Sequence, residues 1–97
     1  MRYDKNREDL YKKAISCFGK EAQQMMAIEE MGELIQAISK YDRDIWDIES
    51  LAEEIADVSI MMEQLCVLHN IRDLVHRKQN SKLFALDSVV RENESEL

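Results

Sequence analysis

Proline is absent from this 97-residue chain, and glycine occurs only twice. Both residues interrupt helices, because proline lacks an amide donor and glycine costs backbone entropy. Their scarcity favours long, uninterrupted helices. The sequence therefore predicts an all-α protein.

Paired cysteines and long apolar runs are also missing. Cys17 and Cys66 form neither a CxxC spacing nor a disulfide-rich frame, which indicates core residues in a reducing compartment. No apolar run approaches the roughly 20 residues that span a bilayer. The charged N-terminus has no apolar segment typical of a signal peptide. We expect a cytoplasmic protein with no membrane partner.

Positive charge is in deficit. Thirteen Lys and Arg face 20 Asp and Glu, for a net charge of −7. A nucleic-acid polymer requires a basic face to neutralise its phosphates, so we expect no such partner. A small nucleotide can still bind an acidic protein when metal ions mediate the contact.

The length suits a single domain over residues 1–97, with a core over about residues 7–90 and a charged C-terminal tail.

Apolar residues recur at helical spacing and predict four helices. These are a helix that ends at Gly19, a second over residues 20–41, a third that ends near Asn70 and a fourth over about residues 71–90. Asp4 or Asn6 can cap the first helix, and Asp47 or Ser50 the third. The turn at residues 41–44 is short, which makes the second and third helices antiparallel neighbours. The expected fold is an antiparallel four-helix bundle.

The expected inner faces of this bundle are apolar. They carry Leu10, Ala14, Ile15 and Phe18; Ala22, Met25, Met26, Ala27, Met31, Leu34, Ile35 and Ile38; Leu51, Ile55, Val58, Met62 and Leu65; and Leu74, Val75, Leu83, Phe84 and Leu86. Ile28, Ile35 and Ile38 point in a different direction from Met26 and Ala37. A lone short bundle would leave part of this surface exposed, so we expect at least a dimer.

Two acidic pairs interrupt these apolar faces: Glu30 with Glu33, and Glu54 with Asp57. Helical residues three apart lie within about 60° around the axis and roughly 4.5 Å along it, so each pair points one way. Unpaired inward carboxylates would cost several kcal/mol each. A hard divalent cation held by oxygen ligands from both helices would offset that cost.

The short turn brings the two pairs to similar heights along the neighbouring helices. Four carboxylates at one place either have raised pKa values or bind cations. Since neither His nor Cys belongs to the set, Mg²⁺ or Mn²⁺ is favoured over zinc. The sequence therefore predicts a magnesium site made by Glu30, Glu33, Glu54 and Asp57.

Residues 29–33 (EEMGE) followed by residues 54–57 (EIAD) resemble the EExxE and ExxD motifs of the MazG-like, all-α nucleoside triphosphate pyrophosphohydrolases. The resemblance covers roughly residues 10–85. It implies that the four acids hold Mg²⁺ and that the chain cleaves between the α- and β-phosphates, releasing a nucleoside monophosphate and pyrophosphate. It also implies a homodimer or homotetramer with sites near the subunit interface.

The resemblance further assigns catalytic roles. Glu29 would contact a further metal or orient the attacking water. The mechanism itself then requires a proton acceptor, which would be Glu29 or a less tightly coordinated ligand among the four, such as Glu30. The fourth helix of relatives contacts the phosphates, which here implies Lys78, Asn80 and Lys82. Their spacing departs from the family's lysine-asparagine-arginine arrangement.

Other interpretations of the same residues stay open. The acids could serve a non-catalytic protein that stores or senses a divalent cation, or a structural helical partner protein with interhelical salt bridges. Lys78 and Lys82 could lie on a solvated face. Trp46, in the connecting turn, could stack on a base or pack against the helix ends.

Overall fold

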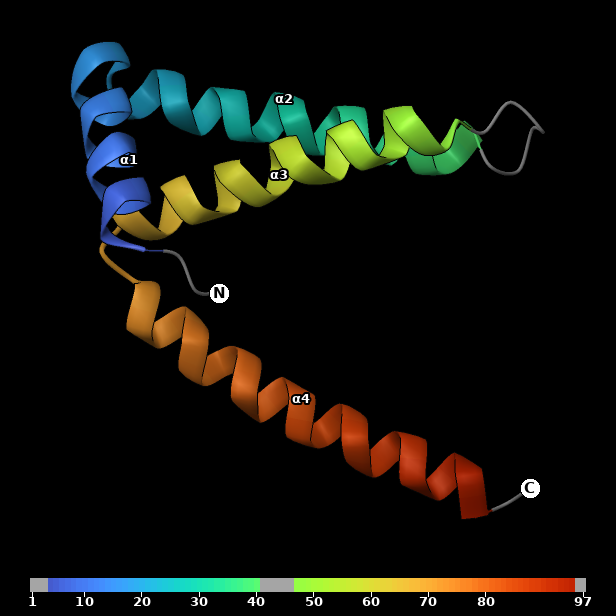
Figure 1. Ribbon diagram of the computed structural model, residues 1–97. Coiled ribbons are helices and arrows are strands. Elements are labelled where there is room, and N and C mark those ends of the chain that lie inside the picture. Colours follow the sequence, from blue (N-terminus) through green and yellow to red (C-terminus); the bar gives the residue numbers. More distant parts are fainter. Residues whose placement is uncertain (1–3, 41–46, 96–97) are drawn as a thin grey trace.

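The computed structural model describes residues 4–40 and 47–95. Within these ranges the chain forms four helices and no strand, which confirms the all-α class (Figure 1). The helices are α1 (Lys5–Phe18), α2 (Lys20–Ser39), α3 (Ile48–Leu68) and α4 (Arg72–Ser95). The predicted turn at residues 41–44 and Trp46 lie outside the described residues.

The first helix begins and ends at residues whose chemistry suits those positions. Of the two candidate caps, Asp4 is the one used: its carboxylate accepts a 2.9 Å hydrogen bond from the amide of Arg7. Gly19 ends the helix, as predicted, and has φ of 92°. Glycine adopts this region without the steric cost that a side chain would add.

Asp47 caps α3. Its two carboxylate oxygens accept 3.0 Å hydrogen bonds from the amide of Glu49 and the hydroxyl of Ser50, so both predicted candidates take part. These bonds lower the pKa of Asp47, the Ser50 hydroxyl being the larger cause and the Glu49 amide the next. The cap fixes where α3 starts after the connection.

The last helix differs from the prediction at its end. The sequence predicts that the fourth helix ends at about residue 90, but α4 continues to Ser95. One turn of this extension is supported by an ion pair between Arg91 and Asp87, 2.9 Å apart. Such exposed i,i+4 pairs add a few tenths of a kcal/mol to a helix. The predicted end of this helix was therefore wrong by about five residues.

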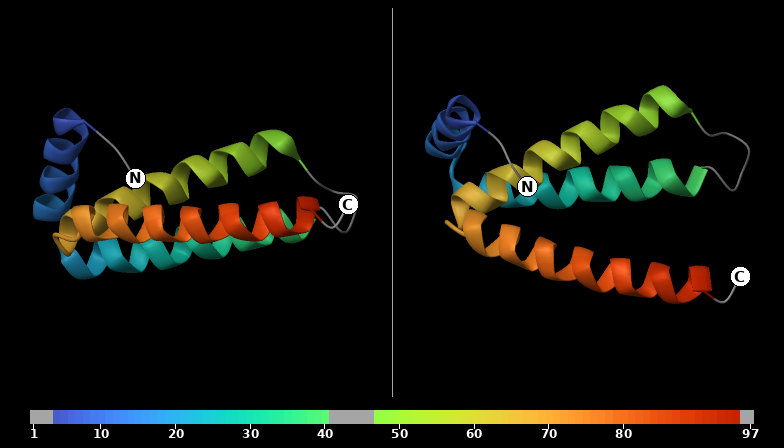
Figure 2. Two further views of the ribbon diagram at one scale, coloured as in Figure 1. Left: turned by 90° about the horizontal axis from the view of Figure 1, so that it is seen from below. Right: turned by 60° about the horizontal axis from the view of Figure 1, so that its bottom comes forward.

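The helices α2 and α3 form an antiparallel hairpin, side by side along most of their length (Figures 1 and 2). Seven of the eight buried residues in the described ranges lie on this hairpin: Gln23, Ala27 and Ala37 on α2, and Val58, Met61, Glu63 and Cys66 on α3. Alanines on the α2 side let the two backbones approach closely. This hairpin is the scaffold on which the acidic residues lie.

The helix α1 crosses one end of the hairpin and contacts both α2 and α3 (Figure 1). Its inward residue is Tyr11, which is 4% exposed. The predicted inner face of this helix was wrong for Leu10 and Phe18, which are 62% and 68% exposed, whereas Ala14 and Ile15 are half-buried. Polar contacts orient α1 instead: the Tyr11 hydroxyl donates a 2.6 Å hydrogen bond to the carboxylate of Glu63, which also pairs with Arg7 at 3.2 Å.

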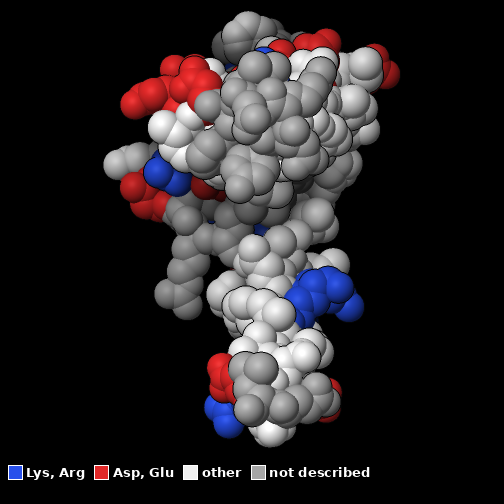
Figure 3. Space-filling model, turned by 90° about the vertical axis from the view of Figure 1, so that its right-hand side faces the viewer, with Lys and Arg blue, Asp and Glu red and all other residues white. Residues whose placement is uncertain are grey.

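The helix α4 diverges from the hairpin; it contacts α3, and Arg72 at its start forms a 3.6 Å ion pair with Glu8 of α1 (Figures 1 and 2). None of its described residues is buried. Figure 3 shows α4 projecting from the body of the molecule with much uncharged surface along its visible side. A single chain therefore does not close a four-helix core.

No helix in the described ranges has the length and apolarity needed to cross a membrane.

Several residues expected in the core are consequently exposed. They are Met25, Met26, Ile35 and Ile38 of α2, Ile55 and Met62 of α3, and Leu74, Leu83, Phe84 and Leu86 of α4. The apolar periodicity predicted the helices correctly. It did not predict which apolar face has a partner inside the same chain.

Candidate metal centre

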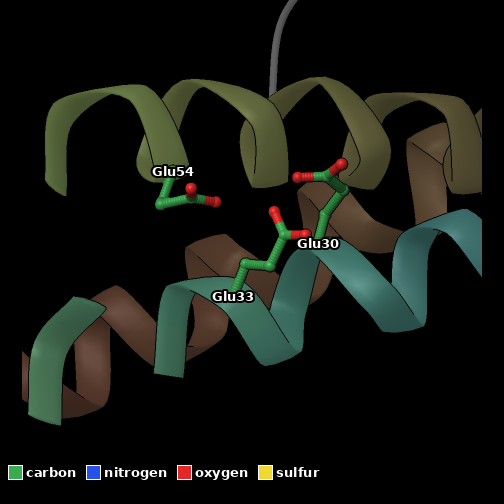
Figure 4. Close-up of side chains that lie close together, drawn as sticks. All are labelled: Glu30, Glu33 and Glu54. Carbon is green, nitrogen blue, oxygen red and sulfur yellow. The ribbon is translucent and has the colours of Figure 1, made fainter. Parts of the chain in front are cut away.

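Three of the four predicted carboxylates converge between α2 and α3. Glu30 and Glu33 reach out from α2 and Glu54 from α3, and each offers one oxygen to a group whose members all lie within 4.8 Å of one another (Figure 4). We call these three residues the acidic cluster. Their convergence agrees with the predicted geometry of the motif pairs.

The burial of neighbouring residues explains why these acids meet. Ala27 and Ala37 flank the α2 acids on the same helical face and are both buried against α3. Val58, one turn after Glu54, is buried from the other side. Packing of these small and branched side chains sets the hairpin's rotation. That rotation leaves Glu30 and Glu54 half-buried and Glu33 exposed at the edge.

Asp57, the fourth predicted ligand, is exposed and lies outside the group of three. Its charge nevertheless raises the pKa values of both Glu30 and Glu54. Asp57 is therefore close enough to act on the cluster electrostatically. A rotamer change would be needed to add its carboxylate to the same ligand set.

Burial is the largest cause of the raised pKa of Glu30, followed by the charges of Glu33 and Asp57. For Glu54 the order is burial, then Glu33, then Asp57. One oxygen of each, Oε2, is buried without a hydrogen-bond partner. Buried oxygens without a donor are costly, and a hard cation is a partner that satisfies them.

Another inward carboxylate, that of Glu63, has hydrogen-bond donors for its oxygens, unlike the Oε2 atoms of Glu30 and Glu54. Glu63 is 6% exposed and binds the Arg7 guanidinium and the Tyr11 hydroxyl. The other ion pairs of the described residues join Glu8 with Lys12 and Arg72, and Arg91 with Asp87. None reaches the acidic cluster. In the described part of the chain, the cluster thus lacks the cationic side chain that interhelical salt bridges would require.

The donor set fits a hard divalent cation. Carboxylate oxygens from two helices, without His or Cys, are the ligands that Mg²⁺ and Mn²⁺ prefer. The net charge of the cluster and the two buried, unpartnered oxygens both favour cation binding. Glu30, Glu33 and Glu54 would hold the ion, with Asp57 beside them.

The remaining predicted site residues lie apart from this group. Glu29 is exposed next to Glu30 on α2. Lys78, Asn80 and Lys82 are exposed on α4, the helix that diverges from the hairpin (Figure 1). Within one chain, the structure does not bring these three to the acidic cluster.

A cavity of about 490 Å³ adjoins the cluster, which sequence reasoning did not anticipate. It lies at the loop end of the hairpin and is lined by Glu33, Gln36, Ala37, Lys40, Asp47, Ser50 and Glu54. We call it the loop-side pocket. Gln36 and Lys40 follow Glu33 by three and seven residues, so the same helical spacing that paired the acids could have identified them.

The chain matches no protein-family model, no curated protein and no solved structure. The resemblance to MazG-like pyrophosphohydrolases thus rests on the two acidic motifs and stays a prediction.

Proposed function

We propose that this protein is a Mg²⁺-dependent nucleoside triphosphate pyrophosphohydrolase that cleaves the α–β phosphate bond and also accepts Mn²⁺. One observation carries the proposal: three carboxylates from two helices converge, and two of them present a buried oxygen with no hydrogen-bond partner. The MazG-like motif pair supplies the reaction class.

The roles of the residues follow from the needs of phosphoryl transfer, which are charge neutralisation and in-line positioning. Mg²⁺, when bound, would supply that neutralisation and lower the pKa of a water. Glu30, Glu33 and Glu54 would hold the metal, and Asp57 would join them after a change of rotamer. Glu29, or Glu30 when it is less tightly engaged, orients the attacking water and accepts its proton.

The active unit is proposed to be a homodimer or homotetramer. The accessible surface is 7781 Å² for an 11.4 kDa chain, whereas a compact monomer of that mass exposes about 5,800 Å². The excess, roughly 2,000 Å², is larger than the ~800 Å² that each partner buries in a standard interface. Lys78, Asn80 and Lys82 would contact phosphates where assembly places an α4 helix beside a hairpin.

The proposed location is the cytoplasm. Both cysteines are free, as a reducing compartment would allow. Cys66 is buried as predicted, whereas Cys17 is exposed, so the prediction of a core position was wrong for Cys17.

A screen of ribo- and deoxyribonucleoside triphosphates with Mg²⁺ tests the reaction. Monophosphate and pyrophosphate should appear together, and ¹⁸O from labelled water should enter the monophosphate if attack is at the α-phosphorus. Glu30→Gln and Asp57→Asn should abolish turnover while keeping the helix content. Diphosphate with orthophosphate as initial products would overturn the assignment.

A divalent-cation-binding protein without catalysis is the second candidate. It is favoured by the distance of the α4 cations from the acidic cluster within one chain. Cation-dependent thermal stabilisation without turnover of any triphosphate would support it. A purely structural role would give neither result, and the lack of a described Lys or Arg at the cluster argues against that role.

A further inference from the structure

The loop-side pocket is continuous with the acidic cluster because Glu33 and Glu54 line both. A ligand held by the cluster therefore extends directly into the pocket. Its volume, about 490 Å³, leaves room for phosphate groups beyond the one at the metal.

The described lining of this pocket is polar and carries one cation, Lys40. Asp47 and Ser50 are committed to capping α3, where the Ser50 hydroxyl donates to Asp47. Gln36 and Lys40 form no side-chain hydrogen bond or ion pair with any described residue. The charge of Lys40 contributes weakly to the lowered pKa of Asp47, and its ammonium donors remain open to a ligand. Among the described lining residues, only Ala37 is apolar.

Helical geometry sets Lys40 at a useful reach from the metal ligands. Lys40 follows Glu33 by seven residues, which places it about 10 Å further along α2 and within about 20° of the same direction. A lysine side chain is long and flexible. It can therefore meet a phosphate that trails away from the cluster towards the loop.

We propose that Lys40, assisted by Gln36, binds the β,γ-diphosphate end of the substrate, which becomes the leaving pyrophosphate. This inference rests on the proposed function. Attack at the α-phosphorus places that phosphate at the metal, and the strongly anionic leaving group then lies over the single described cation of the pocket. Lys40 is thus a specificity-determining residue for the length of the polyphosphate chain.

The test compares Lys40→Gln with the wild type and with Lys20→Gln, a matched change at the opposite end of α2. Lys40→Gln should lower kcat/KM for the triphosphate about 10- to 100-fold, the range expected for a hydrogen bond to a charged group. Inhibition by inorganic pyrophosphate should weaken by a similar factor, and inhibition by the nucleoside monophosphate should not change. Lys40→Arg should restore most of the loss, and Lys20→Gln should resemble the wild type.

The outcomes separate this inference from the proposed function. The role of Lys40 would be overturned if Lys40→Gln changed inhibition by pyrophosphate and inhibition by the monophosphate equally, or changed neither. If the wild type hydrolyses no nucleotide, the proposed function fails. In that case, titration with inorganic tripolyphosphate in the presence of Mg²⁺ still tests the role of Lys40. Equal affinities of the wild type and Lys40→Gln for tripolyphosphate would refute that role. The Mg²⁺-induced rise in Tm should be the same in both proteins, since Lys40 is not a metal ligand.

Discussion

Glu30 and Glu54 bind their protons more tightly in the folded chain than in the unfolded one, because burial and neighbouring acids raise their pKa values. The free energy of unfolding without metal should therefore fall as the pH rises above the ordinary value of 4.5 and through the raised values. The lowered pKa of Asp47 has the opposite effect on the free energy of unfolding, which should fall as the pH drops below the ordinary value of 3.8. The effect of Asp47 and the effect of the two glutamates therefore lie in separate pH ranges.

Metal binding should show the reverse pH dependence, because the ligands must lose their protons first. We expect the Mg²⁺-induced rise in Tm to grow over the interval in which stability without metal declines. Thermal unfolding from about pH 4 to pH 8, with and without Mg²⁺, measures both trends. A metal effect that does not change across this range would contradict the carboxylate site.

Glu30→Gln should have two opposite consequences at neutral pH. Without metal it should raise Tm, because a neutral amide replaces a partly buried charge among other acids. With Mg²⁺ the further rise seen in the wild type should disappear. Glu53→Gln, an exposed neighbour on α3, is the matched control and should keep the metal effect. Loss of the metal effect in the control as well would point to a non-specific response to ionic strength.

Gly32 lies inside α2, in the first acidic motif, without a positive φ and with open space where a Cβ would be. Gly32→Ala should stabilise the protein by about 0.5–1 kcal/mol, because alanine loses less backbone entropy in a helix. Urea unfolding at a fixed protein concentration measures the change. Destabilisation would show that another copy or a ligand approaches the α2 backbone at this position.

At the scale of the element, one polar network joins α1 to α3. The Tyr11 hydroxyl lies 2.6 Å from Glu63, and the Arg7 guanidinium completes the arrangement. Tyr11→Phe should cost about 1.5–3 kcal/mol, because it removes a hydrogen bond to a buried charge. Urea unfolding gives the size of the effect.

The double variant Tyr11→Phe with Glu63→Gln tests whether the loss comes from that bond. Coupled residues give non-additive changes in stability, so the double variant should lose less than the sum of the two single variants. Additive losses would mean that Tyr11 contributes only through packing.

The helices α2 and α4 each carry an apolar stripe that has no partner in the same chain. On α2, Ile28 and Ile35 lie about 140° around the helix from Glu33 and Lys40, respectively. A second chain can therefore pack on the isoleucines without covering the acidic cluster or the loop-side pocket. This arrangement allows assembly and substrate access together.

At the scale of the whole molecule, the chain is extended for its size. Its radius of gyration is 16.8 Å, whereas a compact domain of 97 residues has about 12.5 Å. Together with the excess surface, this extension supports the proposed assembly, in which further copies would cover the apolar faces. We expect at least a dimer at micromolar concentration.

Ile35→Asp should lower the oligomeric mass measured by light scattering, since Ile35 is 65% exposed on the α2 stripe and a charge there would be costly to bury. Lys13→Asp, on the exposed side of α1, is the control and should leave the mass unchanged. A monomeric wild type would refute the expected assembly.

Much of the local structure follows directly from the sequence. The absence of proline, Gly19 as a terminator, Asp4 and Asp47 as caps, and helical periodicity predicted the four helices with small errors at their ends. The spacing of Glu30 with Glu33, and the short connection before Glu54, predicted their convergence. These features depend on interactions within a few residues or between adjacent helices, which is why pattern alone is sufficient.

Tertiary structure decided the rest. Whether Leu10, Ile35 or Phe84 has a partner depends on how whole helices cross, and an apolar stripe looks the same in sequence whether its partner belongs to the same chain or to another. The selection of Tyr11 as the inward residue of α1 required knowing where Glu63 is buried. The loop-side pocket, with Lys40 in its lining, also required the tertiary structure. A cavity depends on the gap between two helix ends, and the spacing of residues along one helix does not determine that gap.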